Sequence, residues 1–273
     1  MKFVKNNKVL IIICIISFLF FLYPFVAEYW NAKHSNHIIY EYGNIINEYD
    51  EEKVKEILEE AREYNKSLLD RKSSFSLTDE QKIKYNSILN IDNGGNIGYI
   101  TIDAIDVNIP IYHGISDFTL KNNVGHLEWS SLPVGGESTH AVLSAHSGLI
   151  DSRLFTDLNK LKIGDKFVIH VLNERLVYEV DQIKTVEPDN NDDLIIEEGK
   201  DLVTLITCTP YGINTHRLLV RGHRIDDNKE FSGWNPNGYE LNKFIQAAIM
   251  SIIPLLIFIT IIIIKNKKTK KKY

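Results

Sequence analysis

The sequence predicts a mainly β domain, a closed barrel or a sandwich, that follows a helical segment and lies between two membrane spans. From Ile97 onward, short β-branched runs alternate with turn residues, which is typical of such all-β folds. Before Ile97, apolar residues recur at helical spacing. The runs 9–27 and 244–264 are almost continuously apolar, and a stretch of roughly 20 apolar residues spans a bilayer.

The first apolar run is interpreted as an uncleaved anchor and not as a signal peptide. Bulky residues, Tyr23-Pro24-Phe25, stand where a small-residue cleavage site would be needed. Lysines precede the first run and follow the second, and Lys-rich flanks stay in the cytoplasm. We therefore expect a two-pass plasma-membrane protein with both termini in the cytoplasm and residues 28–243 outside the cell.

The charge distribution makes nucleic acid an unsuitable partner for the outer region. The whole chain carries a net charge of −5, but nine of its lysines lie in the two terminal tails. Without those nine lysines, 22 basic residues remain against 36 acidic ones, a net charge of −14. Such a surface does not favour nucleic-acid binding. The basic C-terminal tail serves as a topology signal and can contact anionic membrane lipid.

Two helices are predicted before the β-rich part. Residues 47–70 carry apolar residues at helical spacing with charged residues between them. Thr78-Asp-Glu-Gln81 has the pattern of a capping box and predicts a short helix that ends near Leu89. Residues 71–77 between the two helices are polar and irregular, and residues 92–96 form a turn.

The β-rich part contains seven runs that predict strands. These runs are 98–102, 107–112, 140–144, 167–172, 176–186, 202–207 and 218–225. A short helix is expected at 152–161, and residues 226–240 are polar enough to form the linker to the second span.

The last two predicted strands form a hairpin that brings two reactive side chains together. Pro210 cannot donate a ladder hydrogen bond and Gly212 can adopt a positive φ, so the first strand should end near Thr209. A hairpin of this length brings Cys208 near Arg217. A guanidinium beside a thiol can stabilise a thiolate, or an oxyanion that forms on a substrate carbonyl.

The other candidate residues follow from their positions. Cys14 lies in the first apolar run, so Cys208 is the only cysteine of the outer region and has no disulfide partner there. His146 follows a predicted strand and precedes Gly148, a position that suits a cleft. A zinc site of Cys208, His216 and His223 lacks the paired close spacings of metal sites.

Several blocks of the chain resemble the class C sortases, the pilin-polymerising transpeptidases of Gram-positive bacteria. The block Thr-Leu-Ile-Thr-Cys-Thr-Pro-Tyr-Gly-Ile-Asn-Thr-His-Arg over residues 204–217 looks like the signature of that family. The segments 98–102, 110–114 and 143–149 resemble further family blocks in the same order. The resemblance covers roughly residues 40–226, and it implies an eight-stranded β-barrel.

The resemblance also implies roles for three residues. Cys208 would be the nucleophile, His146 the general acid and base, and Arg217 the oxyanion stabiliser. The expected substrates are pilin or surface-protein precursors with an LPXTG-like sorting signal, which is cleaved between Thr and Gly. The acceptor would be a lysine amine of the next pilin or a cell-wall amine, and neither a cofactor nor a metal is expected.

One stretch departs from the family pattern. Class C sortases usually carry a lid with an Asp-Pro-aromatic motif, but residues 69–77 contain no proline. Asp70 and Phe75 are the candidates for the acidic and aromatic roles, and they are not adjacent, so we expect a weakly docked or open lid. The predicted regions are a cytoplasmic tail 1–8, a span 9–27, a helical and lid segment 28–96, the barrel 97–226, a linker 227–243, a span 244–264 and a basic tail 265–273.

A simple cysteine peptidase, with water as the acceptor, is also possible, and two further alternatives stay open at this point. One is a sortase that anchors surface proteins or pili to the cell wall without polymerising them. The other, from a different class, is a non-enzymatic assembly protein that uses the barrel only to bind sorting signals. The presence of a thiol, an imidazole and a guanidinium in suitable places favours the enzyme.

Overall fold

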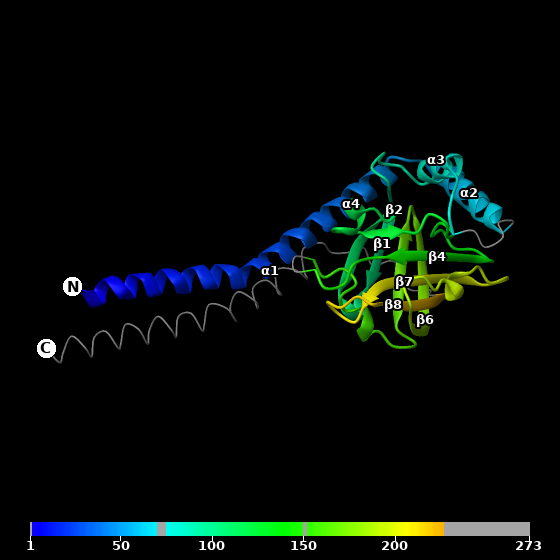
Figure 1. Cartoon of the computed structure of the whole chain (residues 1–273). Helices are drawn as coiled ribbons and strands as arrows, with labels where there is room; N and C mark the ends of the chain where they lie inside the picture. Colours follow the sequence, from blue (N-terminus) through cyan, green and yellow to red (C-terminus); the bar gives the residue numbers. More distant parts are fainter. Residues whose placement is uncertain (1, 70–74, 150–151, 227–273) are drawn as a thin grey trace. The chain divides into compact units, whose positions relative to one another are not determined.

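The computed structural model describes residues 2–69, 75–149 and 152–226, and the predicted second span at 244–264 lies outside them. Figure 1 shows helices followed by a barrel. The helices are α1 (Lys2–Asn47), α2 (Glu51–Leu68), α3 (Asp79–Ser87) and α4 (Asp117–Leu120). The strands are β1 (Asn96–Ile102), β2 (Val107–His113), β3 (Val124–His126), β4 (Thr139–Ser144), β5 (Lys166–Val171), β6 (Glu174–Val186), β7 (Asp201–Thr209) and β8 (His216–Ile225). Three short 3₁₀ turns are η1 (Asp103–Ile105), η2 (Leu158–Lys160) and η3 (Asp192–Leu194).

The eight strands form one closed barrel, which confirms the predicted fold. Their order around the barrel is β1-β2-β3-β4-β7-β8-β6-β5, and β5 pairs with β1 to close it. The pairs β2·β3 and β4·β7 are parallel, and the others are antiparallel. Each of the seven predicted strands is present, with ends within two residues of those expected. Strand β3 was not predicted, because three residues are too few to show an alternating pattern.

The barrel interior is filled by the alternate side chains of its strands. On β7, Val203 and Leu205 belong to the main hydrophobic core, and on β4 the same holds for Ala141 and Leu143. Closure between β1 and β5 depends on Gly98, where a Cβ would lie 2.2 Å from the carbonyl oxygen of His170. Any larger residue there would push the two closing strands apart.

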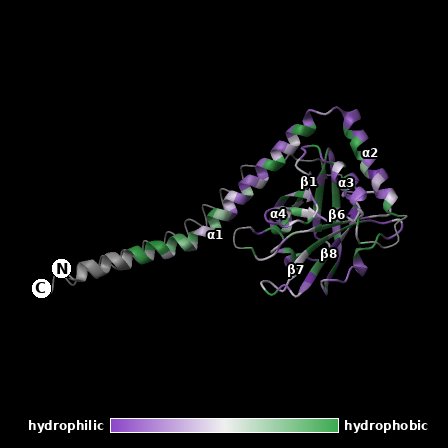
Figure 2. Ribbon diagram, turned by 45° about the horizontal axis from the view of Figure 1, so that its top comes forward, coloured by the Kyte–Doolittle hydropathy of each residue, from purple (hydrophilic) through white to green (hydrophobic). Residues whose placement is uncertain are grey.

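Helix α1 extends well past the apolar run and reaches the barrel. Residues Ile15–Asn47 of α1 are the only stretch of helix in the described residues that is long and apolar enough to cross a membrane, and the N-terminal part of this stretch is green in Figure 2. The part of α1 from Ala32 onward belongs to the same compact unit as the barrel. The hydroxyl of Tyr42 donates to the carbonyl of Ile97 at 2.7 Å and accepts from the amide of Leu172 at 2.9 Å. Tyr42 thus fixes the end of α1 to strand β1 and to the turn between β5 and β6.

The two predicted helices are present and pack against the barrel. Asp50 caps α2 by accepting from the amide of Lys53, so α2 starts after residue 47, which still belongs to α1. The capping box at the start of α3 is confirmed. The amide side chain of Asn65 makes two hydrogen bonds with the backbone of Leu132, at 2.7 and 2.9 Å. These bonds hold the last turn of α2 at a fixed place on the barrel.

The prediction of a helix at 152–161 is wrong. The described part of this segment holds turns and the single 3₁₀ turn η2. Leu154 has a positive φ of 36°, which a right-handed helix cannot accommodate. Phe155 and Leu158 are nevertheless buried in the core, so the segment packs against the barrel without forming an α-helix.

Candidate active site

The β7–β8 hairpin places Cys208 directly opposite Arg217. The two residues are register partners in the antiparallel ladder, and Thr209 with His216 forms the next pair. The strand ends at Thr209 as predicted, and the loop is closed by amides of Ile213 and Asn214 that both donate to the carbonyl of Pro210 at 3.0 Å. The predicted approach of the thiol and the guanidinium is confirmed at the level of strand pairing.

His146 reaches the same place from strand β4. Strand β4 runs parallel to β7, with Ser144 opposite Ile206, and the amide of Ala145 still donates to the carbonyl of Ile206 at 3.1 Å. His146 and Cys208 each lie two residues beyond this last pair. The hydroxyl of Ser147 donates to the carbonyl of Cys208 at 2.7 Å, which shows that the two segments stay together. Three residues predicted from separate parts of the sequence therefore meet at one end of the barrel.

These residues belong to the outer face of the barrel and not to its interior. Side chains alternate along a strand, and Val203 and Leu205 of β7 face the interior core. The intervening residue Ile206 belongs to a second, smaller apolar cluster with Val142, Leu194 and Leu219. Cys208 follows Ile206 on this outer face, so the cluster provides an apolar floor beside the thiol.

The guanidinium of Arg217 is anchored to its own hairpin. Its Nη1 donates to the carbonyls of Asn214 at 3.3 Å and His216 at 3.2 Å. Among the described residues, only this nitrogen of the guanidinium has hydrogen-bond partners. The remaining N–H groups of Arg217 can therefore donate to a substrate without breaking a bond of the hairpin.

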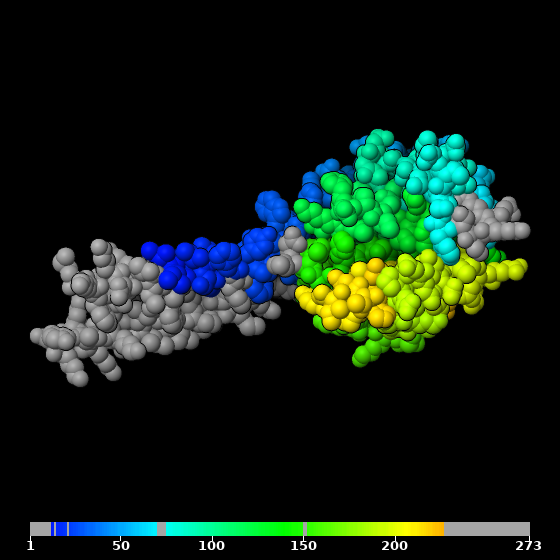
Figure 3. Space-filling model, viewed as in Figure 1, coloured from blue at the N-terminus to red at the C-terminus, as the bar shows by residue number. Residues whose placement is uncertain are grey.

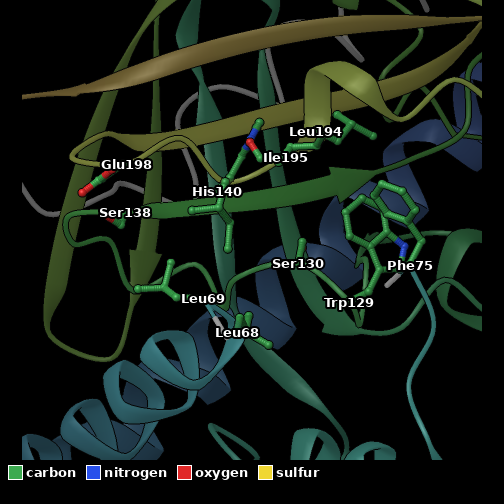
Figure 4. A pocket seen from close by; sticks show the side chains of 11 residues that line it. Leu68, Leu69, Phe75, Trp129, Ser130, Ser138, His140, Leu194, Ile195 and Glu198 are labelled. Atoms are coloured by element: carbon green, nitrogen blue, oxygen red, sulfur yellow. The ribbon is translucent and has the colours of Figure 1, made fainter. Parts of the chain in front are cut away.

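A cavity of about 470 Å³ lies on the outer face of the barrel (Figure 4). Its lining residues come from the end of α2, the segment between α2 and α3, β4 and the segment before it, and the loop between β6 and β7: Leu68, Leu69, Phe75, Trp129, Ser130, Ser138, His140, Leu194, Ile195, Ile196 and Glu198. In Figure 3 the cyan segment that begins at Phe75 lies beside the yellow-green β6–β7 loop. Apolar side chains and polar groups thus both line this cavity.

Polar contacts fix the β6–β7 loop that forms one wall of this cavity. His140 bonds to the carbonyl of Ile195 through Nδ1 at 2.9 Å and to the hydroxyl of Thr204 through Nε2 at 2.7 Å. Arg221 bonds to Asp181 at 3.0 and 3.1 Å and to Glu197 at 2.9 Å. Burial lowers the pKa of His140, so its imidazole is neutral at physiological pH.

Only one of the two lid candidates belongs to the described residues. Asp70 lies outside them. Phe75 makes an edge-to-face contact with Trp129, with ring centroids 4.9 Å apart, and 40% of its surface is exposed. Trp129 in turn packs against the outer apolar cluster. Phe75 is therefore in contact with the outer face of the barrel through Trp129, and its role in a lid stays a prediction.

The three residues considered for a zinc site, Cys208, His216 and His223, do not come together around one point. His223 pairs with Leu202, six residues before Cys208 on β7, and its Nδ1 lies 4.0 Å from a carboxylate oxygen of Asp181. His216 bonds instead to the hydroxyl of Thr215 at 2.9 Å. The three side chains are thus spread along the hairpin.

Sequence reasoning missed Trp129, Ser147 and the polar residues that hold the β6–β7 loop. Ser147 carries a weak signal, since it directly follows His146 at the end of a predicted strand. The position of Trp129 follows only from tertiary packing, because the segment before β4 has no regular pattern.

Comparisons with known proteins agree with this geometry. Residues 100–225 match the family model described as the sortase domain. Sortase C1 of Streptococcus agalactiae is 50% identical, with a TM-score of 0.69, and the match covers 70% of this chain and 100% of that one. The chain belongs to the sortase family.

Two further solved structures extend the comparison. Sortase C of Clostridium perfringens, solved with the C-terminal cell wall sorting motif, is 48% identical with a TM-score of 0.62, and the match covers 70% of this chain and 99% of that one. Sortase C of Streptococcus pneumoniae is 43% identical with a TM-score of 0.64, over 71% of this chain and 99% of that one. The similar structures are mostly class C sortases. This sortase is accordingly a cysteine transpeptidase.

Proposed function

We propose that this sortase cleaves an LPXTG-like sorting signal between Thr and Gly and transfers the acyl group to a lysine amine of the next pilin subunit. The observation that carries the proposal is the meeting of Cys208, His146 and Arg217 at the ends of β7, β4 and β8. Support for the substrate class comes from the similar sortase C structures, one of which contains a sorting motif and another of which addresses pilin substrate specificity.

In the first half of the reaction, the thiolate of Cys208 attacks the carbonyl carbon of the scissile Thr–Gly bond. The resulting oxyanion forms beside the guanidinium of Arg217, which stays charged at working pH and so donates hydrogen bonds without losing a proton. His146 then protonates the leaving glycine amine, and the C–N bond breaks to give a thioester on Cys208.

In the second half, the amine of the acceptor lysine attacks the thioester carbonyl. His146 takes a proton from this amine, and the Cys208 thiolate leaves as the new amide bond forms. Because the same imidazole gives a proton in one half and receives one in the other, the enzyme returns to its starting state without an external acid or base.

The proposed place of action is the outer surface of the plasma membrane. The N-terminal apolar helix α1 is consistent with a membrane anchor, and Lys-rich flanks predict cytoplasmic termini. External protease on intact protoplasts should digest residues 28–243 and spare tags at both ends. A protected middle region would refute this topology.

The experiment that tests the activity is product analysis with the full-length enzyme in detergent. A Leu-Pro-Glu-Thr-Gly peptide is incubated with and without a lysine-containing pilin domain, and products are identified by mass spectrometry. An isopeptide-linked product supports polymerisation. Ligation only to a cell-wall peptide amine would favour anchoring, and hydrolysis alone in the presence of both amines would refute the proposed transfer.

A further inference from the structure

The segment that carries His146 is tied to the Cys208 strand by side-chain hydroxyls. The buried hydroxyl of Thr207 donates to the carbonyl of Ala145 at 2.8 Å, and the hydroxyl of Ser147 donates to the carbonyl of Cys208 at 2.7 Å. One bond precedes His146 and the other follows it. Each bond crosses between the two segments, in opposite directions, so His146 is held on both sides.

These bonds begin where the backbone ladder ends. The β4–β7 pairing stops at Ser144 and Ile206, and the last backbone bond across it is made by the amide of Ala145. Beyond this point no described backbone hydrogen bond joins the segment after β4 to the end of β7. The hydroxyls of Thr207 and Ser147 replace the missing ladder bonds over the two residues that matter for the reaction.

The far side of the same segment is also fixed. The amide of Gly148 donates to the hydroxyl of Thr156 at 3.0 Å. Gly148 has a positive φ of 80°, and a Cβ there would lie 3.3 Å from the ring of Tyr211 in the β7–β8 loop. The segment therefore turns sharply after Ser147, and the aromatic ring covers the turn.

The imidazole of His146, by contrast, has no hydrogen-bond partner among the described residues. Among the described residues no acidic side chain orients the ring, so the described contacts act on its position through the backbone. A backbone displacement of about 1 Å can cost two orders of magnitude in rate. The bonds that fix the backbone on either side of His146 thus influence the reaction directly.

We propose that Ser147 is a positioning residue that sets the distance between His146 and Cys208 through its hydrogen bond to the Cys208 carbonyl. This inference rests on the proposed function, in which these two residues react. The bond also fixes the peptide plane that follows Cys208, and with it the direction of the thiol-bearing strand end. Thr207 supports the same separation from the buried side.

The test is a matched pair of substitutions in the full-length enzyme in detergent. Ser147→Thr keeps the hydroxyl, and Ser147→Val has nearly the same shape as threonine but lacks it. Ser147→Ala removes the hydroxyl without adding bulk. Ser67→Ala is the control, since the Ser67 hydroxyl donates to the carbonyl of Tyr64 at 2.6 Å in helix α2, away from the proposed machinery.

Transpeptidation of a Leu-Pro-Glu-Thr-Gly peptide is measured as kcat and KM. The enzyme concentration is corrected for the folded fraction, which is determined by circular dichroism. We expect about a tenfold lower kcat for Ser147→Ala and Ser147→Val, the size of one lost hydrogen bond, with KM unchanged. Ser147→Thr and Ser67→Ala should match the wild type. Equal kcat in all the Ser147 variants, or equal loss in all three, would overturn the positioning role.

A second measurement separates positioning from general destabilisation. The pH profile of Cys208 alkylation depends on a nearby imidazole, so the Ser147→Ala profile should move toward that of His146→Ala. An unmoved profile would overturn the inference even if kcat fell. Failure of the proposed function itself is visible separately, because the wild-type enzyme would then hydrolyse the peptide in the presence of both amines and form no ligated product.

Discussion

His140 and His146 lie six residues apart on one segment and on the same outer face, yet their surroundings are opposite. His140 is fully buried, and both of its ring nitrogens are bonded, one to a loop carbonyl and one to the Thr204 hydroxyl. His146 is only half-buried, and no hydrogen bond from the described residues reaches its ring. The first histidine holds a loop in place, and the second is the general acid and base of the proposed mechanism.

This contrast separates the two ends of the β4–β7 pair. At the His140 end, polar side chains use up their hydrogen bonds on the β6–β7 loop and shape the cavity wall. At the His146 end, the strands give way to loops, and Cys208, His146 and Arg217 keep unused donor and acceptor capacity. A satisfied histidine contributes to stability, and a histidine with free nitrogens can take part in catalysis.

The largest effect is expected from the thiol. Cys208→Ala should abolish thioester formation and transpeptidation, because Cys208 is the only cysteine of the predicted outer region. Thioester formation is followed by mass spectrometry of the enzyme with the sorting peptide. Cys14→Ala, a substitution in α1, serves as the control and should retain full activity. Residual ligation by Cys208→Ala would show that the nucleophile is another residue.

The two histidines themselves give the next largest difference. His146→Gln should lower kcat by about 10²–10⁴, the usual contribution of a general acid and base. His140→Gln should keep turnover within about tenfold, since a glutamine amide can still donate to the carbonyl of Ile195 and preserve one loop contact. The two variants are compared under saturating sorting peptide. A similar decrease of kcat in both variants would mean that the different surroundings of the two histidines do not reflect different roles in the reaction.

Arg217→Lys tests whether geometry as well as charge matters at the Cys208 end. A lysine keeps the positive charge but loses the planar fork that can hold both the hairpin carbonyls and an oxyanion. We expect kcat to fall by about 10²–10³, as for one lost oxyanion donor. Circular dichroism should show an unchanged fold. Turnover near the wild-type value would remove Arg217 from the mechanism.

The burial of His140 makes the stability of the folded protein depend on pH. Burial lowers the pKa of His140 below its ordinary value of 6.5, so below that pH the unfolded chain binds a proton that the folded chain does not. The free energy of unfolding should therefore fall as the pH decreases below about 6.5. Urea titrations should show a weaker decrease in His140→Gln than in the wild type. Parallel curves for the two proteins would contradict the burial argument.

How far the sequence alone predicts this molecule depends on the range of the interactions involved. Strand positions, the capping box at Thr78 and the Cys208–Arg217 hairpin depend on neighbouring residues, so local patterns predicted them. The barrel and the role of His146 came from resemblance to a family. Strand order alone would not have distinguished a barrel from a sandwich.

The parts that could not be predicted depend on distant contacts. His140 and His146 look alike in sequence, and only the packing of Ile195 and Thr204 against His140 separates them. The helix expected at 152–161 is excluded by the positive φ of Leu154, which no local sequence pattern indicates. Trp129 becomes part of the cavity because Phe75, 54 residues earlier in the chain, contacts it.

The smallest effect is expected from the segment around Phe75. Residues 71–77 contain no proline, so the unfolded segment has more conformational entropy to lose when it docks. Its described anchor is the edge-to-face contact of Phe75 with Trp129, and such a pair contributes about 0.5–1.5 kcal/mol beyond its buried area. An anchor of that strength can slow access to the thiol by only about tenfold. We therefore expect similar rates of Cys208 alkylation, within about tenfold, in the wild type, in Phe75→Ala and in a variant that lacks residues 70–77, all in a Cys14→Ala background.

Phe118→Ala is the control, since Phe118 is 88% exposed on α4 and does not line the cavity. A much larger acceleration on deletion would show that the segment shields Cys208 through contacts other than the Phe75–Trp129 pair, and the proposed open lid would be wrong.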